Sequence, residues 1–344
     1  MTKQRFGIGM LIMAAALFCP AVAQDVPTAA SETPIAPHEM AIAPADAATT
    51  ILQDFVIDRS ERMTVQVQVN GSEAVPFIVD TGSERTVIAN DLAKRLALEA
   101  GPKLTLATIS GKSQVNSFYI GTLTTAAVNM EGLEAPGLER SNLGAYGLLG
   151  IDSLEDNRVL LDFTRKTMEV LPSPRGRGKS KLENGMIVVT AKKQAGRMII
   201  SSARIDGIKV DIILDTGAQS SMGNAALRNR LKRRHRTIEF VPVQMRSVTG
   251  SLLVGEFTQL QKIEVGGLLI QDLPITFSNN YAFTALDMQD RPAILLGMDA
   301  LKLFDRVMID FRNRRVGFDL PRGVERQSFK RFASSNARMQ NSAP

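Results

Sequence analysis

The stretch VPFIVDTGS at residues 75–83 returns in modified form as VDIILDTGA at residues 210–218. Each copy is an apolar run that ends in Asp-Thr-Gly, and each follows a β-rich stretch that closes on Asn-Gly or Asp-Gly. Apolar runs joined through these dipeptides predict β-hairpins. Asp80 and Asp215 are therefore expected in matching positions, each at the end of a strand.

The match continues downstream, so the sequence contains an internal repeat. After each triplet come a predicted short helix, a Ser/Thr-Gly turn, further strands and Leu-Leu-Gly-x-Asp, and each half closes on an apolar strand ending in Asp-Phe. The two halves are predicted to span residues 55–171 and 186–320. The predicted helices lie at 90–98 and 224–232, the turns at Ser110-Gly111 and Thr249-Gly250, and the Leu-Leu-Gly-x-Asp segments at 148–152 and 295–299.

Three further segments differ in composition from the two halves. Residues 24–54 are rich in Ala, Pro and Thr and are interpreted as a flexible leader, with five acidic residues and no Lys or Arg. Residues 172–185 form a Pro/Gly/Ser-containing linker. Residues 321–344 are predicted to be a flexible tail, which is basic because it has five Arg or Lys against one Glu.

The N-terminus has the pattern of a signal peptide over residues 1–23. Lys3 and Arg5 precede an apolar run that is too short to span a membrane comfortably, and a small-x-small cleavage site ends at Ala23. Cleavage there would leave a mature chain without cysteine, because Cys19 would be removed. We expect a periplasmic or secreted protein, with an uncleaved signal anchor as the alternative. Lipidation at Cys19 is disfavoured because the bulky Phe18 precedes it.

The composition excludes several kinds of catalytic site. The 344 residues include two His, one Cys and no Trp. A Ser-His-Asp or Cys-His triad needs a well-placed imidazole, but His38 lies in a Pro/Ala-rich stretch and His235 lies among arginines. One Cys and two His are also too few for a structural zinc site of the usual kind. A hydrolase with this composition must depend on carboxylates, or on a metal that they bind.

The charge balance is basic, with a net charge of +6 and a pI near 9.5. Such a balance suggests nucleic acid for a cytosolic chain, but an exported chain rarely meets any, so no nucleic-acid partner is expected. Two interpretations stay open for basic segments such as 228–236. One is a weak contact with an anionic membrane or envelope surface, and the other is a solvated face.

The two Asp-Thr-Gly strands, each followed by Leu-Leu-Gly, resemble the aspartic protease superfamily. The length of each half resembles retropepsins more than the larger lobes of pepsins. The resemblance covers approximately residues 60–320 and implies an all-β fold of two retropepsin-like β-barrel lobes that form a bilobal pseudo-dimer. It also implies an exported aspartic endopeptidase with Asp80 and Asp215 as its catalytic pair, a peptide or protein substrate, and neither a cofactor nor a metal.

The same resemblance assigns roles to the neighbouring residues. Thr81 and Thr216 resemble threonines that hydrogen-bond the opposite loop, and Gly82 and Gly217 are expected to permit the sharp turns. Ser83 resembles a residue that hydrogen-bonds the outer carboxyl oxygen, and its counterpart in the second half is Ala218. Gly111 and Gly250 are expected at the tips of two flaps, near residues 108–114 and 247–252.

Two carboxylates that share one proton can perform peptide hydrolysis without a metal or a histidine. Like charges held close cannot both ionise, which is the known behaviour of aspartic protease pairs. The ionised group takes a proton from water while the neutral group polarises the carbonyl. Which aspartate holds the proton is not assigned by the sequence.

Four other aspartates of the repeat have predicted structural roles. Asp152 and Asp299 are predicted helix N-caps, and Asp162 and Asp310 are predicted structural residues at strand ends. The alternative function is a catalytically silent peptide-binding module that keeps the protease fold. The chain is expected to be a monomer, since the linker is long enough for the halves to fold against each other. Pairing of halves between two chains is the other arrangement.

Overall fold

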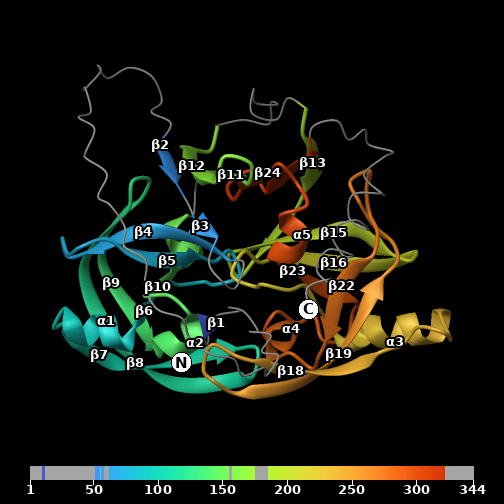
Figure 1. Cartoon of the computed structure of the whole chain (residues 1–344), viewed down its shortest axis with the longest axis horizontal. Coiled ribbons are helices and arrows are strands. Elements are labelled where there is room, and N and C mark those ends of the chain that lie inside the picture. Colours follow the sequence, from blue (N-terminus) through green and yellow to red (C-terminus); the bar gives the residue numbers. More distant parts are fainter. Residues whose placement is uncertain are drawn as a thin grey trace, which may run out of the picture.

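The protein is an all-β molecule with two lobes side by side and a further sheet across one end (Figure 1). The computed structural model describes residues 62–154, 157–174 and 185–321, together with the backbone of three short strands before residue 62. The all-β, two-lobed fold class expected from the sequence is confirmed.

The first lobe is built on one sheet with the order β1-β7-β8-β9-β6-β10-β5-β4-β3, in which β8 also pairs with β4. This extra pairing curls the sheet toward a barrel. Its strands are β1 (Met10–Leu11), β3 (Val56–Ile57), β4 (Met63–Val69), β5 (Val75–Val79), β6 (Val87–Ala89), β7 (Ala100–Thr108), β8 (Gly111–Thr124), β9 (Asn129–Leu138) and β10 (Gly147–Leu149), with helices α1 (Asn90–Arg95) and α2 (Arg140–Leu143) and the 3-10 helix η1 (Ile151–Ser153).

The second lobe repeats this plan with the order β18-β19-β22-β17-β23-β16-β15-β20-β21, and β14 pairs with β15. Its strands are β14 (Lys192–Gln194), β15 (Arg197–Ile205), β16 (Ile208–Leu214), β17 (Met222–Gly223), β18 (Val241–Arg246), β19 (Leu252–Leu260), β20 (Ile263–Val265), β21 (Leu268–Ile270), β22 (Leu273–Phe277) and β23 (Ala293–Leu296), with helices α3 (Ala225–Arg234), α4 (Tyr281–Ala285) and α5 (Met298–Leu301).

A six-stranded sheet joins the two halves, and each half contributes three strands. Its order is β13-β25-β24-β11-β12-β2, so the first half supplies β2, β12 and β11 and the second half supplies β24, β25 and β13. At its centre β11 pairs antiparallel with β24, with Val159 opposite Ile309. Both side chains are buried. The strands are β2 (Ile51–Asp54), β11 (Asn157–Asp162), β12 (Thr167–Pro172), β13 (Ile187–Thr190), β24 (Arg306–Asp310) and β25 (Arg315–Asp319).

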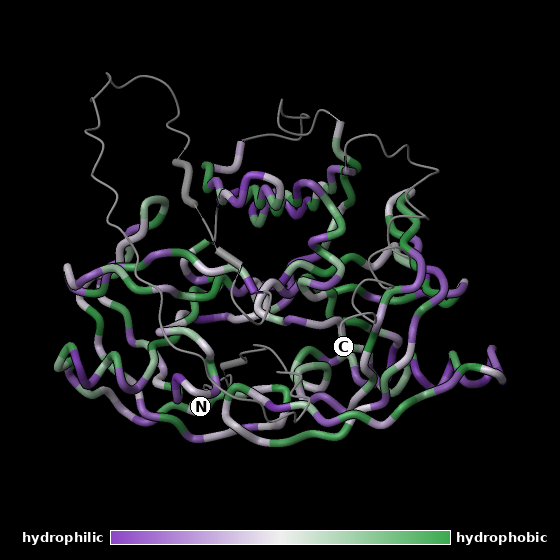
Figure 2. The backbone as a smooth tube through the Cα atoms, in the orientation of Figure 1, coloured by the Kyte–Doolittle hydropathy of each residue, from purple (hydrophilic) through white to green (hydrophobic). Residues whose placement is uncertain are grey.

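Alternation along the strands explains how the chain forms these layers. In β4 the sequence MTVQVQV buries every valine and exposes both glutamines, which is the period-two pattern of a half-buried strand. The strands that lead to the two triplets, β5 and β16, are mostly buried, and both end in an apolar run that is fully buried. Figure 2 shows hydrophobic residues recurring along the strands of both lobes. The interior strands therefore give the two aspartates a rigid base.

The first predicted boundary differs from the structure. Residues 51–54 fall within the predicted flexible leader, but they form β2 and pair with β12. The pairing covers the edge of β12, which would otherwise expose unpaired backbone groups. Apart from the backbone of β1 and β2, and residues 172–174, 185 and 321, the predicted signal peptide, leader, linker and tail lie outside the described residues.

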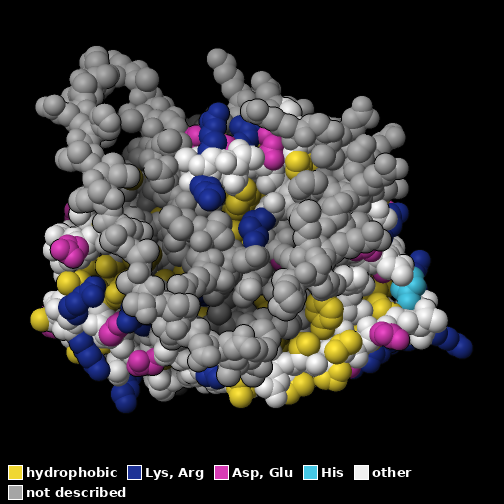
Figure 3. Space-filling model, viewed as in Figure 1, with side chains coloured by type: hydrophobic (Ala, Val, Ile, Leu, Met, Phe, Trp, Pro, Cys, Tyr) yellow, Lys and Arg dark blue, Asp and Glu magenta, His cyan; other side chains and the backbone are white. Residues whose placement is uncertain are grey.

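The β18–β19 hairpin carries exposed apolar side chains on the outside of the second lobe. Val241, Leu252 and Val254 are 54%, 63% and 71% exposed. Figure 3 shows hydrophobic side chains gathered over this hairpin, at the lower right. No helix among the described residues is both long and apolar enough to cross a membrane.

Candidate active site

Each aspartate follows a buried strand that is supported by a Leu-Leu-Gly strand. β10 pairs in parallel with β5, and β23 pairs in parallel with β16. The pairing continues into the triplets, because Asp80 N–H donates to Leu149 O at 2.9 Å and Asp215 N–H donates to Leu296 O at 3.1 Å. A Cβ at Gly150 would lie 2.4 Å from the backbone of the first loop, so glycine is required where the two segments approach.

The two Asp-Thr-Gly loops are bonded to each other through their threonines. Thr81 N–H donates to Thr216 Oγ1 at 3.0 Å, and Thr216 N–H donates to Thr81 Oγ1 at 3.1 Å. Each hydroxyl in turn donates to a carbonyl on the opposite lobe, Thr81 to Leu214 O at 3.1 Å and Thr216 to Val79 O at 2.7 Å. Both threonines are buried. Four reciprocal bonds thus fix the relative position of the two aspartates.

The glycines leave room for the opposite carboxyl group. A Cβ at Gly82 would lie 2.6 Å from Asp215 Cγ, and a Cβ at Gly217 would lie 2.2 Å from Asp80 Cγ. The backbone N–H groups also point at the carboxyls. Gly82 N–H donates to Asp80 Oδ1 at 2.7 Å, while Asp215 Oδ1 accepts from Gly217 N–H at 3.0 Å and from Ala218 N–H at 3.1 Å. The structure thus brings together the two aspartates and both glycines that the sequence singles out.

Burial raises the pKa of both carboxyls above the usual 3.8. For Asp80, hydrogen bonds from Gly82 and with Asp215 oppose this effect of burial on the pKa, as does the charge of Arg197. For Asp215, the nearby charge of Asp80 adds to burial, so the pKa of Asp215 is raised well above 3.8. Because one ionised carboxyl disfavours ionisation of the other, the pair shares a single proton over an interval of pH.

The predicted contact of Ser83 with the outer oxygen of Asp80 is wrong. Ser83 Oγ donates instead to the carbonyl of Arg85 at 2.8 Å. The hydroxyl satisfies a carbonyl of its own turn, which is a common local bond for serine. In the second loop the counterpart, Ala218, contacts its aspartate through its backbone N–H alone.

Asp152 and Asp299 are not helix N-caps as predicted. The N-cap positions of η1 and α5 belong to Gly150 and Gly297, whose short helices have no side-chain cap. The carboxyl groups instead hold the segment after each triplet. Asp152 accepts from Thr86 N–H and Oγ1, both at 2.9 Å, and Asp299 accepts from Ser221 N–H at 2.8 Å and Oγ at 2.7 Å. They are positioning residues behind the active-site loops.

Stability should fall as pH rises through the titration of Asp299. Burial raises the pKa of Asp299 to about 6, so the folded state holds a proton that the unfolded state has released. The protonated Asp299 carboxyl stabilises the folded state fully below pH 4, and this stabilisation is lost as the pH rises to about 6. The pKa shift corresponds to a change of about 3 kcal/mol in the free energy of unfolding. In Asp299→Asn, thermal unfolding at pH 4 and pH 7 should therefore give a smaller difference in midpoint than in the parent. The exposed Asp290→Asn should keep the parental difference.

Arg197 is a functional candidate that sequence reasoning missed. Its side chain is fully buried at the start of β15 in the second half, yet it reaches the first loop. Arg197 Nε donates to Gly82 O at 2.8 Å, and Nη1 pairs with Glu84 Oε1 at 2.8 Å. It therefore holds the loop of Asp80 from the opposite lobe. Arg62 and Arg197 precede their aspartates by the same number of residues, a repeat that could have flagged them.

Two hairpins occupy the predicted flap positions, and their turns meet through hydroxyl groups. The first flap is the β7–β8 hairpin, and the second flap is the β18–β19 hairpin. Ser110 Oγ donates to Ser247 Oγ at 3.2 Å and lies 3.4 Å from Thr249 Oγ1. Gly111 begins β8 immediately after the first turn, with φ 125°, and Gly250 lies within the second turn, with φ 85°. The predicted tip glycines thus occupy turn positions that favour glycine.

Each flap also reaches the opposite lobe. Ile109, in the first turn, is 1% exposed and packs in a cluster with Ile213, Phe283 and Leu295 of the second half. Tyr281 N–H donates to the carbonyl of Ile109 at 3.0 Å. In the second turn, a Cβ at Gly250 would lie 3.1 Å from the Asn142 side chain of the first half. Each flap turn therefore contacts both halves.

Among the described residues, no three His, Cys, Asp or Glu side chains form a group that could hold a metal ion.

Comparison with protein families gives one match in each half. Residues 65–156 match the family described as "gag-polyprotein putative aspartyl protease", and residues 201–300 match the family described as "Aspartyl protease". A comparison with curated proteins gave no match. The two matched segments contain Asp80 and Asp215 and follow one another along the chain. The chain therefore contains two aspartyl protease domains in tandem, consistent with a retropepsin-like aspartic protease whose two halves lie in a single polypeptide.

Proposed function

We propose that the chain is an aspartic endopeptidase that hydrolyses peptide bonds with a water molecule activated by Asp80 and Asp215. One observation carries this proposal. The two carboxyls are fully buried, each lies against the glycine of the opposite loop, and burial raises the pKa of both. Among the described residues, the outer oxygens Asp80 Oδ2 and Asp215 Oδ2 have no hydrogen-bond partner. These two oxygens remain for water and substrate.

The proposed reaction begins with Asp80 ionised and Asp215 protonated. Asp80 takes a proton from water as the water oxygen attacks the carbonyl carbon of the peptide bond. Asp215 donates a hydrogen bond to the carbonyl oxygen, which becomes a hydroxyl of the tetrahedral intermediate. The proton on Asp80 then passes to the leaving nitrogen. One hydroxyl of the intermediate returns its proton to Asp215 as the C–N bond breaks. The carboxylic acid and the amine leave, and the pair again holds one proton.

The substrate is proposed to be an extended polypeptide segment. The outer edge of β7, beside the turn of the first flap, pairs in parallel with the short strand β1 at Leu106 and Ala107. Backbone pairing of this kind binds extended chains with little regard to sequence. Its position beside the flap supports an unfolded or extended substrate over a folded one.

The active pair is proposed to form within one chain. The reciprocal bonds of Thr81 and Thr216, the contact from Arg197 to Glu84, and the pairing of β11 with β24 all join the two halves. Specific activity should then be independent of protein concentration. Activity that collapses on dilution would point to pairing between chains.

Hydrolysis of an unfolded protein such as reduced casein, followed by mass spectrometry of the fragments, tests the proposed function. We expect internal cleavage that persists in EDTA and is absent in Asp80→Asn. Binding of casein by the folded protein with no cleavage at any pH between 3 and 8 would favour the silent peptide-binding module instead.

The pH dependence of cleavage should be bell-shaped and displaced above the usual range of an isolated aspartate. Below the lower pKa of the pair both carboxyls are protonated and no base is present. Above the upper pKa both are ionised and no proton remains for the carbonyl. Because burial raises both pKa values, kcat should rise above pH 3.8 and fall on the alkaline side. A rate that rises steadily into alkaline pH would contradict the shared-proton mechanism.

A further inference from the structure

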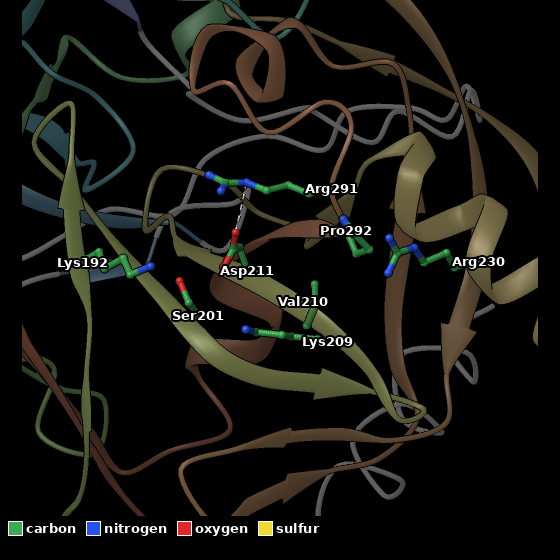
Figure 4. A pocket seen from close by; sticks show the side chains of 8 residues that line it. All are labelled: Lys192, Ser201, Lys209, Val210, Asp211, Arg230, Arg291 and Pro292. Carbon is green, nitrogen blue, oxygen red and sulfur yellow. Dashed lines mark ion pairs between the residues drawn. The ribbon is translucent and has the colours of Figure 1, made fainter.

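A cavity of about 310 Å³ lies on the second lobe, away from the two aspartates. Figure 4 shows its lining, which comes from several separate elements. Lys192 belongs to β14, Lys209 to β16 and Arg230 to α3, while Arg291 precedes β23. In Figure 4 the polar ends of Lys192, Lys209 and Ser201 face the same space. Side chains from distant parts of the sequence thus converge on one cavity.

The charges in this cavity are unbalanced. Its described lining has four cationic side chains and one carboxylate, Asp211, which leaves an excess of three positive charges. Asp211 Oδ2 is already paired with Arg291 Nε at 3.2 Å. Within the described part of the chain, no ion pair is formed by Lys192, Lys209 or Arg230. A concave surface with charges of one sign concentrates the electrostatic field and attracts counter-ions.

The internal repeat allows equivalent positions of the two halves to be compared, which shows whether the fold requires these charged residues. Counted from the two aspartates, Lys209 and Asp211 correspond to Ala74 and Pro76 in the first half. Counted from the Leu-Leu-Gly glycines, Arg291 corresponds to Gly144. The same fold therefore forms in the first half without these charges.

Arg230 does have an arginine counterpart in the first half, Arg95, but that side chain is used differently. The Arg95 guanidinium lies over the Tyr146 ring, 5.1 Å from its centre. The position is thus compatible with a packed arginine, whereas the second half presents its arginine to a cavity. The cationic lining is a feature of the second half alone.

We infer that this cavity binds an anion that carries phosphate groups. Ammonium groups such as those of Lys192 and Lys209 bind phosphate as point charges, and the guanidinium of Arg230 offers paired donors to its oxygens. The hydroxyl of Ser201 adds a neutral hydrogen-bonding group. A ligand with two or more negative charges is favoured because a single charge would leave most of the excess unbalanced. The site is independent of the proposed peptidase activity.

Isothermal titration of the full chain with inorganic pyrophosphate tests this inference. We expect one binding site per chain, with an affinity that weakens as sodium chloride is raised. The double variant Lys192→Gln/Lys209→Gln should lower the affinity by about tenfold or more, since it removes two charge-assisted contacts. Asp80→Asn should bind as the parent does, which separates this result from the outcome of the activity tests.

A charge-matched control distinguishes a site from a general effect of net charge. Lys94 and Lys166 are exposed and lie outside the cavity. The double variant Lys94→Gln/Lys166→Gln loses the same charge and should keep the parental affinity within about twofold. The inference is overturned if the parent does not bind pyrophosphate, or if both double variants weaken binding equally.

A second experiment, with lipid vesicles, determines whether the phosphate belongs to a lipid headgroup or to a soluble compound. Vesicles that contain phosphatidic acid are compared with vesicles of phosphatidylcholine alone, for the parent and for Lys192→Gln/Lys209→Gln. Binding to phosphatidic acid that the variant loses would identify a lipid headgroup as the ligand. Pyrophosphate binding by the parent without vesicle binding would identify a soluble phosphate compound.

Discussion

Replacing Asp80 or Asp215 by asparagine should each lower kcat for peptide hydrolysis by about 10³-fold or more. Neither carboxyl can act alone, because one must accept the proton of water while the other supplies a proton to the carbonyl. The fold should survive, since asparagine has nearly the same shape and its Oδ1 can still accept the N–H bonds of Gly82 or Gly217. The midpoint of thermal unfolding at neutral pH should stay the same or rise, because a buried like-charge interaction is removed.

Asp162→Asn is the matched control for this pair of variants. Asp162 is also buried at the end of a strand, but its carboxylate accepts bonds from Thr164 and Arg165 in a turn of the six-stranded sheet. This control should keep kcat near the parental value. A turnover within tenfold of the parent in either Asp80→Asn or Asp215→Asn, with the control unaffected, would refute the assignment of the two aspartates.

Replacing Arg197 by methionine should weaken both the fold and the reaction. The substitution removes the bonds to Gly82 O and Glu84 and leaves their oxygens without the buried guanidinium. Removing one member of a buried ion pair costs about 3 kcal/mol in the free energy of unfolding, here at the lower end because Glu84 is 23% exposed. Since the loop of Asp80 loses one of its contacts with the second lobe, kcat should fall about tenfold or more, and KM should change less.

Arg204→Met is the control for Arg197→Met, because Arg204 lies on the same strand, is exposed, and bonds only the nearby Gly207 carbonyl among the contacts described for it. Arg204→Met should leave both the free energy of unfolding and kcat near the parental values. Arg197→Lys should recover part of kcat by restoring the charge. An Arg197→Met protein that is less stable but turns over at the parental rate per folded molecule would limit Arg197 to a structural role.

The elements that the sequence predicts well are those in which a local motif determines the geometry. Asp-Thr-Gly at the end of an apolar strand predicts a buried aspartate followed by a tight turn, and the second copy predicts the same for the other half. The contacts of Thr81 and Thr216 follow from the family resemblance, and the structure has them.

The elements that the sequence does not predict depend on contacts between distant segments. The pairing of β11 with β24 joins residues about 150 positions apart, and no local pattern specifies such a partner. Arg197 was overlooked because an arginine next to an apolar strand is usually exposed. Its burial depends on Gly82 and Glu84 of the other half. The roles of Ser83 and Asp152 were misassigned for a related reason, since several partners compete for one hydroxyl or carboxylate.

The shared six-stranded sheet has an evolutionary consequence. Its two central strands, β11 and β24, are equivalent segments of the repeat, and they pair antiparallel as two identical segments would in a symmetric dimer. Fusion of two such half-length chains into one gene would preserve the assembly while removing the requirement for identity. Each half could then diverge, as Glu84 has from its counterpart Gln219. A modern chain cut between residues 174 and 185 should accordingly remain associated as a two-fragment enzyme.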